Sequence, residues 1–402
     1  MLKQLVCVLL IAQSAAAWRR PFPKPRAARN HPQENDAWSA VREQLAGWPL
    51  TDNFAVQVGN ASGTVFKFTK GNFSLHQRVE TASTSKWPMA MGLLGLVADG
   101  TVPSLDAKVA SYVDWWKPTN ASDPRGNITM RHLLSFTSGF GEGSPGDENS
   151  TATCMDNATY APGFLSCAQN VYRTIKLTGP PGHTFTYNSV HLQLAGAVAV
   201  TLTGLDIQAV VEKYLLKPYG MVNTTCYLGA PNPQLAVCLE TTGADYGRFL
   251  QRTLSHSVLP AALVRESEKD HTPFMSHYPS LYGNYGFGHF LECFDSVVGM
   301  TPACRAAKVH CDPGAFGFYP LIDRRNGYYF ELVAYENGKV GYPRSGIPEY
   351  LRLLAKPLVD ATMRGEAGRE WTFGHHTEEY NALSLVDVNY ITNCYIHPEE
   401  CE

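Results

Sequence analysis

Two side chains that can do chemistry together lie within the segment Thr81–Lys86, where Ser83 and Lys86 are three residues apart. In a helix this spacing brings both side chains to one face. A serine hydroxyl attacks a carbonyl carbon only when a base takes its proton, and a lysine amine can be that base when burial or nearby charge lowers its pKa. Backbone N–H groups at a helix N-terminus also stabilise a developing oxyanion. The pair predicts acyl transfer, with Ser83 as nucleophile and Lys86 as proton acceptor.

The residues after this pair decide between that hypothesis and a surface serine and lysine that open an ordinary helix. An apolar stripe at helical spacing follows, and Asp99-Gly100 gives a stop signal. This context favours a buried helix over residues 83–99. Pro88 removes a hydrogen bond to the Thr84 carbonyl, so we expect the first turns to be distorted.

A second candidate group is the segment 180–189, where a Pro/Gly turn leads through Tyr187 into a helical pattern. A phenol placed beside the lysine could relay protons between nucleophile and leaving group. The alternative is a core tyrosine that caps a helix. Ser189 can donate and accept a hydrogen bond, whereas we expect Asn188 to point elsewhere and His191 to be structural.

The elements that must position these residues form a simple order along the chain. A helix over 38–48 and two strands near 54–58 and 66–68 come first, and mostly helical patterns then continue to about residue 270. Strand patterns at 315–322 and 328–335 flank Asn326-Gly327, a dipeptide typical of two-residue hairpins. A last helix is expected from about Pro348, with a bend at Pro357.

This order predicts an α+β fold, in which an antiparallel sheet is flanked by the N- and C-terminal helices and carries a mostly helical inserted lobe, roughly residues 86–270. A groove between lobe and sheet is the expected ligand site. The predicted division is a signal peptide (1–17), a basic Pro-rich arm (18–34), one domain (35–364) and a C-terminal tail (365–402).

The 402-residue composition argues against several classes of protein. The net charge of −3 gives no sign of a nucleic-acid partner, and the apolar runs are too short for a membrane span. Seven Asn-x-Ser/Thr sequons predict N-linked glycans and hence secretion. They lie at Asn60, Asn72, Asn120, Asn127, Asn149, Asn157 and Asn223.

Cysteine spacing agrees with an oxidising compartment. Without Cys7 of the signal segment, eight of nine cysteines form close sequential pairs that could be four short-loop disulfides. They are Cys154 with Cys167, Cys226 with Cys238, Cys293 with Cys304, and Cys394 with Cys401. Cys311 remains, as a reactive thiol, a buried inert residue or a partner in a reshuffled disulfide. No CxxC pair or histidine cluster is present, including His375-His376, so we predict no metal and no cofactor.

Three ordered segments resemble one known superfamily. Ser83–Lys86 resembles the first motif of class C β-lactamases, D-alanyl-D-alanine carboxypeptidases and related esterases. Arg131–Phe140 is similar to their helix-to-loop segment, usually His-Leu-Leu-Thr-His-Thr-Ser-Gly, and Pro181–Gly196 resembles their Tyr-x-Asn region with its helix. The resemblance covers about residues 36–360 and implies a β-lactamase/transpeptidase-like fold.

The resemblance also implies roles for individual residues. Ser83 would be the acylated nucleophile, Lys86 its proton acceptor and Tyr187 the second acid/base. Which of Lys86 and Tyr187 is the starting base stays open, because the two would titrate as a coupled pair.

Two motifs depart from the family pattern. Ser189 stands where the second motif usually has Asn, and Asp312-Pro313-Gly314 stands where the third motif has Lys/His-x-Gly. A slipped register would use His310 as the cation. Because Pro313 has no N–H, the resemblance puts the oxyanion hole at the N–H groups of Ser83 and Ala315, with Ser189, His310 and Gly314 as candidate substrate-binding residues.

These observations predict a secreted serine hydrolase that acts through a Ser83 acyl-enzyme on an ester, amide or lactam. The substrate is a small molecule or a peptide. Loss of the usual cation favours an esterase or peptidase over an antibiotic-degrading lactamase. The alternatives are a non-catalytic glycosylated binding protein on the same fold and a secreted scaffold hardened by its cysteines.

Overall fold

The computed structural model describes residues 36–48, 51–141, 153–275, 283–293, 300–335 and 343–366. The expected signal peptide and arm, Asn149, His375-His376, the Cys394–Cys401 pair and nearly all of the expected tail lie outside these ranges.

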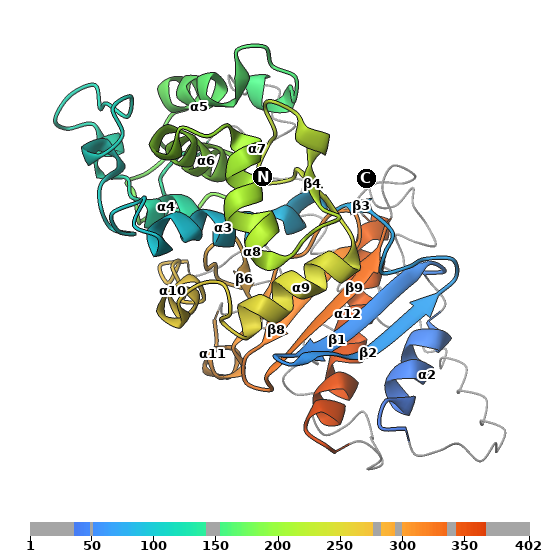
Figure 1. Cartoon of the computed structure of the whole chain (residues 1–402). Coiled ribbons are helices and arrows are strands. Elements are labelled where there is room, and N and C mark those ends of the chain that lie inside the picture. Colours follow the sequence, from blue (N-terminus) through green and yellow to red (C-terminus); the bar gives the residue numbers. More distant parts are fainter. Residues whose placement is uncertain are drawn as a thin grey trace, which may run out of the picture. The chain divides into compact units, whose positions relative to one another are not determined.

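A six-stranded antiparallel sheet joins the two ends of the described chain (Figure 1). Strand β1, next to the edge strand β2, pairs with β2 on one side and with β9 on the other. The N-terminal and C-terminal hairpins thus complete one sheet, as the sequence predicts. In spatial order the strands are β2 (Gly63–Lys70), β1 (Phe54–Asn60), β9 (Tyr328–Ala334), β8 (Phe318–Asp323), β7 (Val309–Cys311) and β6 (Phe290–Leu291).

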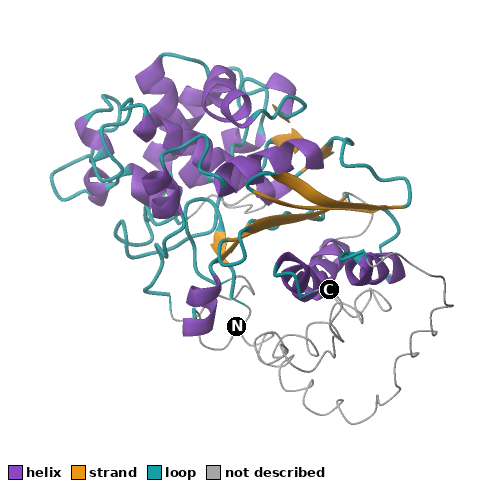
Figure 2. Cartoon of the chain, turned by 60° about the horizontal axis from the view of Figure 1, so that its bottom comes forward, coloured by secondary structure: helices purple, strands orange, loops and turns teal. Residues whose placement is uncertain are grey.

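Helices cover both faces of this sheet (Figure 2). The helices α2 (Ser39–Gly47) and α12 (Pro343–Met363) contact each other, and α12 packs on β8 and β9. On the other face, α9 (Gly243–Leu254) packs on β1, β8 and β9. Strand β1 is therefore buried at nearly every position, instead of alternating between buried and exposed residues.

The chain between the two hairpins forms a mainly helical lobe around two buried helices, α3 (Lys86–Ala98) and α6 (Val190–Thr203). A three-stranded sheet lies at its base, in the order β3 (Val79–Glu80), β5 (Leu239–Thr241) and β4 (Thr225–Cys226). The other elements are η1 (Ala82–Ser85), η2 (Val109–Ser111), η3 (Pro124–Asn127), α4 (Met130–Leu134), η4 (Thr153–Asp156), α5 (Gly163–Thr174), α7 (Ile207–Val211), η5 (Glu212–Leu216), α8 (Lys217–Tyr219), η6 (Tyr227–Gly229), α10 (Ala261–Ser267) and α11 (Pro302–Ala307).

Three element boundaries differ from the sequence prediction. The last helix begins at Pro343 instead of Pro348, so Pro348 lies inside it. Strand β8 begins at Phe318 instead of residue 315, because Gly314–Gly317 forms a turn in which Gly317 adopts a φ of 101°. The segment that contains Ser83 is a 3₁₀ turn, and the α-helix begins only at Lys86.

Three of the four predicted disulfides are present, namely Cys154–Cys167, Cys226–Cys238 and Cys293–Cys304. Cys311 is buried with its thiol free, and burial raises its pKa well above the usual value. An inert buried cysteine therefore fits better than a reactive thiol.

Among the described residues, no single helix has the length and hydropathy of a membrane span. The two helical segments Val190–Thr203 and Ile207–Tyr219 together reach that length and hydropathy, but a bend of 95° separates them.

Candidate active site

The predicted nucleophile and its proton acceptor lie in contact. The Lys86 Nζ atom is 2.9 Å from the Ser83 Oγ atom, across the junction of η1 and α3. Just before Ser83, Ala82 adopts a φ of 48°, a conformation that is costly for a residue with a β-carbon. Such strain persists only where the surroundings enforce it, so the contacts of this turn matter for the position of the hydroxyl.

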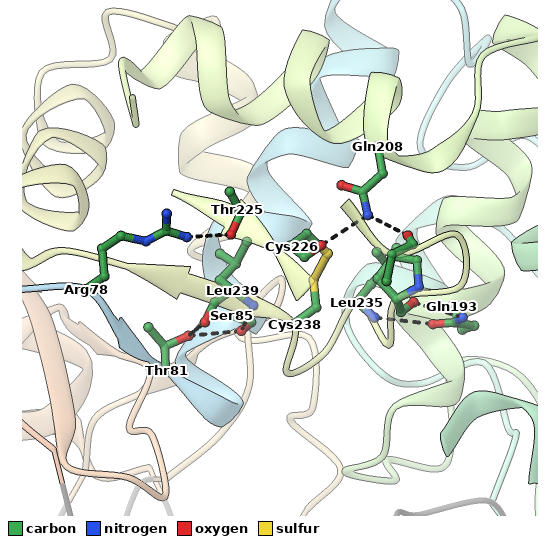
Figure 3. Close-up of a disulfide and its surroundings, with 12 residues drawn as sticks. Arg78, Thr81, Ser85, Gln193, Gln208, Thr225, Cys226, Leu235, Cys238 and Leu239 are labelled. Atoms are coloured by element: carbon green, nitrogen blue, oxygen red, sulfur yellow. Dashed lines mark hydrogen bonds between the residues drawn. A yellow bond between two sulfur atoms is a disulfide. The ribbon is translucent and has the colours of Figure 1, made fainter. Parts of the chain in front are cut away.

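The small sheet supplies one set of these contacts (Figure 3). The backbone N–H and the hydroxyl of Thr81 both donate to the Leu239 carbonyl, each at 3.0 Å. The Leu239 N–H in turn donates to the Ser85 Oγ atom at 3.0 Å. Thr81 and Ser85 thus flank Ser83 and tie its turn to β5.

Tyr246 on α9 compensates for the proline in the first turns of α3. Pro88 has no N–H to donate to the Thr84 carbonyl, and the buried Tyr246 hydroxyl donates to that carbonyl at 3.0 Å. The distortion expected from Pro88 is therefore accommodated by a 3₁₀ turn with an external hydrogen-bond donor. The sequence alone does not predict this role of Tyr246, because the hydrogen bond joins residues that are 162 positions apart.

Burial sets the charge state of Lys86. Its side chain is only 3% exposed, and desolvation lowers its pKa to about 8, against the opposing attraction of the Asp312 carboxylate. The amine also donates to the Ala236 carbonyl at 3.2 Å. A lysine in this state can hold a proton at neutral pH and release it at modest cost. This is the behaviour required of a base that must accept and return a proton.

Tyr187 joins the pair through its ring, whose centre is 4.7 Å from the Lys86 Nζ atom. The ring stacks on Phe290 of β6 at 5.6 Å. The segment before α6 is held by His191, which is bonded to the Thr186 carbonyl and to the Ser138 hydroxyl, both at 2.9 Å. Burial lowers the His191 pKa to about 3, so the ring is neutral. These contacts give His191 the structural place that we expected for it.

The segment that follows β7 packs closely on the nucleophile turn. The Asp312 carboxylate accepts the Trp87 N–H at 2.9 Å, and the Thr84 hydroxyl donates to the Phe318 carbonyl at 3.0 Å. A β-carbon on Gly314 would lie 2.3 Å from the Thr81 carbonyl oxygen, so only glycine fits there. Ala315 follows directly and is half-buried.

In the predicted register of the third motif, the position of the family cation falls on a buried carboxyl group. Asp312 is fully buried, burial raises its pKa well above the usual value, and its Oδ1 atom has no hydrogen-bond partner. The slipped register does not provide a cation either. His310 is buried against His289 at 3.2 Å, and burial lowers the pKa of His310 to about 3. His310 is neutral and cannot be the cation.

The remaining predicted site residues lie near the start of α6. Ser189 is buried at its N-cap, two residues after Tyr187. The Asn188 amide donates to the Phe140 carbonyl at 3.0 Å, which agrees with the expectation that it points elsewhere. Within the described ranges, no three His, Cys, Asp or Glu side chains converge as metal ligands would.

Sequence reasoning missed the loop between Cys226 and Cys238. Its residue Ala236 supplies a carbonyl, and a backbone carbonyl leaves no trace in the residue type. A cavity of about 250 Å³ opens beside the same loop. It is lined by Met155, Asp156, Ala158, Tyr227 and Gln234.

Comparison with known proteins finds similarity to beta-lactamases and to related esterases. A family model described as Beta-lactamase matches residues 56–330. Esterase EstB from Burkholderia gladioli is 30% identical over 148 residues, which are 35% of this chain and 36% of the esterase. The matched region thus spans about a third of the length of that curated relative.

Solved structures show the same fold at low identity. EstCE1, described as a hydrolase with promiscuous acyltransferase activity, is 16% identical with a TM-score of 0.61, over 78% of this chain and 97% of that one. A beta-lactamase from Mycobacterium bovis is 17% identical with a TM-score of 0.56, over 81% of this chain and 99% of that one. These likenesses agree with the predicted α+β, β-lactamase/transpeptidase-like fold.

Proposed function

The chain belongs to the beta-lactamase family, and from this premise we propose that it is a serine hydrolase that forms an acyl ester on Ser83. The observation that carries this proposal is the 2.9 Å contact between the Ser83 hydroxyl and a buried lysine amine whose pKa is lowered to about 8. A surface serine and lysine would show neither the burial nor the lowered pKa.

In the first half of the reaction, neutral Lys86 takes the proton of the Ser83 hydroxyl as the oxygen attacks the substrate carbonyl carbon. The tetrahedral oxyanion accepts hydrogen bonds from the backbone N–H groups of Ser83 and Ala315. Collapse breaks the bond to the leaving group, which takes a proton from the lysine ammonium directly or through the Tyr187 phenol. Water then attacks the carbonyl carbon of the Ser83 ester and gives up a proton to the same groups. Collapse breaks the bond between that carbon and the Ser83 oxygen, which takes this proton as the acid product leaves.

The third-motif segment supports an ester or peptide substrate over a β-lactam. A carboxylate-bearing substrate gains from a cation beside the oxyanion hole, and here that position holds the buried Asp312 while His310 is neutral. Without a cation there, an anionic group gains no charge attraction to offset the cost of its desolvation. Small uncharged esters and amides carry no such cost.

We also propose secretion and glycosylation. The three disulfides fit an oxidising compartment. Of the predicted sequons, Asn72, Asn120, Asn127, Asn157 and Asn223 are exposed and Asn60 is half-buried, so a glycan could reach each of the five exposed sites. A glycosidase that lowers the mass of protein expressed in a secreting eukaryotic cell would support this assignment.

Turnover of p-nitrophenyl esters of increasing acyl length tests the activity, with a cephalosporin as the lactam comparison. We expect ester hydrolysis by the wild type, its loss in Ser83→Ala, and wild-type rates in Ser111→Ala, which removes an exposed hydroxyl outside the site. Wild-type protein that binds these esters without turning them over would favour the non-catalytic binding protein instead.

A further inference from the structure

We propose that the loop closed by the Cys226–Cys238 disulfide, called here the disulfide loop (residues 226–238), is the positioning element for the Lys86 amine. The inference rests on the proposed function, because it concerns the base of that reaction. The disulfide would act on the reaction only through the position of the Lys86 amine.

The contact that matters is the hydrogen bond from Lys86 to the Ala236 carbonyl, at 3.2 Å. A neutral amine has two N–H bonds and one lone pair. When one N–H is held by the Ala236 carbonyl, rotation about the last side-chain bond is restricted, and the lone pair can stay directed at the Ser83 hydroxyl 2.9 Å away. The same carbonyl stabilises the ammonium after it has accepted the proton.

The disulfide loop is not held by regular structure between its two cysteines. Its only helical element is the single turn η6, in which Tyr227 and Leu228 adopt φ values of 45° and 50°. Non-glycine residues in this region are strained and need external constraint. A disulfide restricts such a loop by removing conformational freedom from its open states, and here it joins residues 12 positions apart.

The disulfide lies directly before the residue that joins the loop to the nucleophile turn (Figure 3). Cys226 lies at the end of β4, and Leu239, the residue after Cys238, begins β5 of the same small sheet. Leu239 is the residue that bonds to Thr81 and to the Ser85 hydroxyl. The exit of the loop is therefore held at the turn that carries Ser83, and Ala236 lies only two residues before this exit.

Two glutamines brace the loop from the helical lobe. The Gln193 side chain on α6 donates to the Pro233 carbonyl at 3.2 Å and accepts the Leu235 N–H at 3.3 Å. The Gln208 side chain on α7 donates to the Cys226 and Ala230 carbonyls at 3.1 and 2.8 Å. Gln193 is fully buried and acts on the residue next to Ala236, so it offers a second way to loosen the loop with the disulfide intact.

The chain contains a matched control disulfide. Cys293–Cys304 closes a loop of similar length, with a separation of 11 residues, and joins the end of β6 to α11. Its removal should cost stability to a similar degree. Any effect that appears on opening Cys226–Cys238 but not on opening Cys293–Cys304 is therefore specific to the disulfide loop.

The test compares three variants, a Cys226→Ser/Cys238→Ser double variant, a Cys293→Ser/Cys304→Ser double variant, and Gln193→Leu. For each, the rate of acylation by a p-nitrophenyl ester is measured across the pH range on both sides of the Lys86 pKa, together with the thermal unfolding midpoint. Ser83→Ala serves as the inactive reference.

We expect the Cys226/Cys238 variant to lose about 10- to 100-fold in the plateau rate, with a smaller loss of the same kind in Gln193→Leu. Water that replaces the Ala236 carbonyl relieves the desolvation of Lys86, so the rise of rate with pH should move to higher pH. The other groups at the amine, namely Ser83, the Tyr187 ring and Asp312, are unchanged in these variants. The Cys293/Cys304 variant should keep the wild-type pH profile.

Other outcomes would overturn either the positioning role alone or the proposed function as well. If the Cys226/Cys238 variant folds and keeps the wild-type plateau and pH profile, the positioning role is overturned, and the proposed function stands as long as Ser83→Ala is inactive. If that variant does not fold, Gln193→Leu decides, and a wild-type profile there overturns the role. Wild-type protein that is not acylated, or Ser83→Ala that still is, overturns both the role and the proposed function.

Discussion

The charge on one amine controls the proposed chemistry. Burial lowers the Lys86 pKa to about 8, and only the neutral amine can take the serine proton. The acylation rate should therefore rise with pH and reach half its plateau near pH 8. Stopped-flow measurement of the acylation burst checks this expectation, and a rate already constant well below that pH would contradict it.

Lys86→Met tests whether Lys86 is the group that titrates, because methionine keeps most of the buried volume of the side chain but removes the base. Loss of a general base lowers rates by about 10²- to 10⁴-fold, and the remaining rate should no longer rise through this pH range. If the acylation rate of Lys86→Met still rises through this pH range, another group is the starting base, and Tyr187 is the first candidate.

Asp312 tunes the same titration from the opposite direction. Its carboxylate attracts the lysine ammonium and so raises the Lys86 pKa. Asp312→Asn keeps an acceptor for the Trp87 N–H but removes the charge. The Lys86 pKa should then fall, and the rise of rate should move to lower pH.

The control for Asp312→Asn is Glu331→Gln, which neutralises another buried carboxyl group, bonded to Gln57 on the sheet. The pH profile of acylation should be unchanged in this variant. An Asp312→Asn profile that stays in place, or moves to higher pH, would show that the carboxylate does not act on the lysine.

At the scale of elements, the first turn of α3 depends on a partner from α9. Tyr246→Phe leaves the buried Thr84 carbonyl without its hydrogen-bond donor, which costs about 1–3 kcal/mol. Pro88→Ala restores an N–H in the register that could reach this carbonyl. In the Pro88→Ala background, Tyr246→Phe should therefore cost less.

A double-mutant cycle on the free energy of unfolding, from urea titrations of the four proteins, measures this coupling. A coupling energy near zero would mean that the tyrosine and the proline act independently. The acylation rate of the same proteins would show whether the turn geometry also affects the Ser83 hydroxyl.

The long helices and the two terminal hairpins were predictable from the sequence, whereas the short strands β3 to β7 and several boundaries were not. The Asn326-Gly327 dipeptide and its flanking apolar runs predicted the β8–β9 hairpin, because turn chemistry is a local signal, but the connection spans residues 324–327 instead of two residues. The early part of that pattern, Gly314–Gly317, is a turn because it must pass close to the Thr81 carbonyl. Pro348 lies inside α12, since packing on the sheet overrides the local preference of a proline.

The candidate site shows the same division between local and long-range signals. Ser83, Lys86 and Tyr187 were predicted from motifs, and the structure brings these three together. The contacts of the Ala236 carbonyl and the Tyr246 hydroxyl, and the burial of Asp312, arise between segments distant in the sequence. No residue type or spacing therefore predicts them. Their roles remain predictions for the experiments above.

For the whole molecule, the sheet that carries the third-motif segment depends on a buried ionic anchor. Lys356 on α12 is 2% exposed and bonds to Asp323 of β8 at 2.8 Å and to Asp360 at 3.0 Å. Lys356→Met leaves Asp323 buried without its cation, and removal of one partner of a buried pair costs about 3–5 kcal/mol. The free energy of unfolding should fall by this amount.

Lys217→Met is the control, since Lys217 pairs with Glu212 at 3.4 Å on the surface, where the lysine side chain is 73% exposed. Exposed pairs contribute about 0–1 kcal/mol. Equal losses in the two variants would show that α12 is not anchored by this pair.

Intact mass spectrometry after treatment with a fluorophosphonate, followed by peptide mapping, decides whether Ser83 is the nucleophile activated by Lys86. We expect one adduct, on Ser83, which is absent from Ser83→Ala and forms much more slowly in Lys86→Met. An adduct on any other residue, or equal labelling of the wild type and Ser83→Ala, would contradict it.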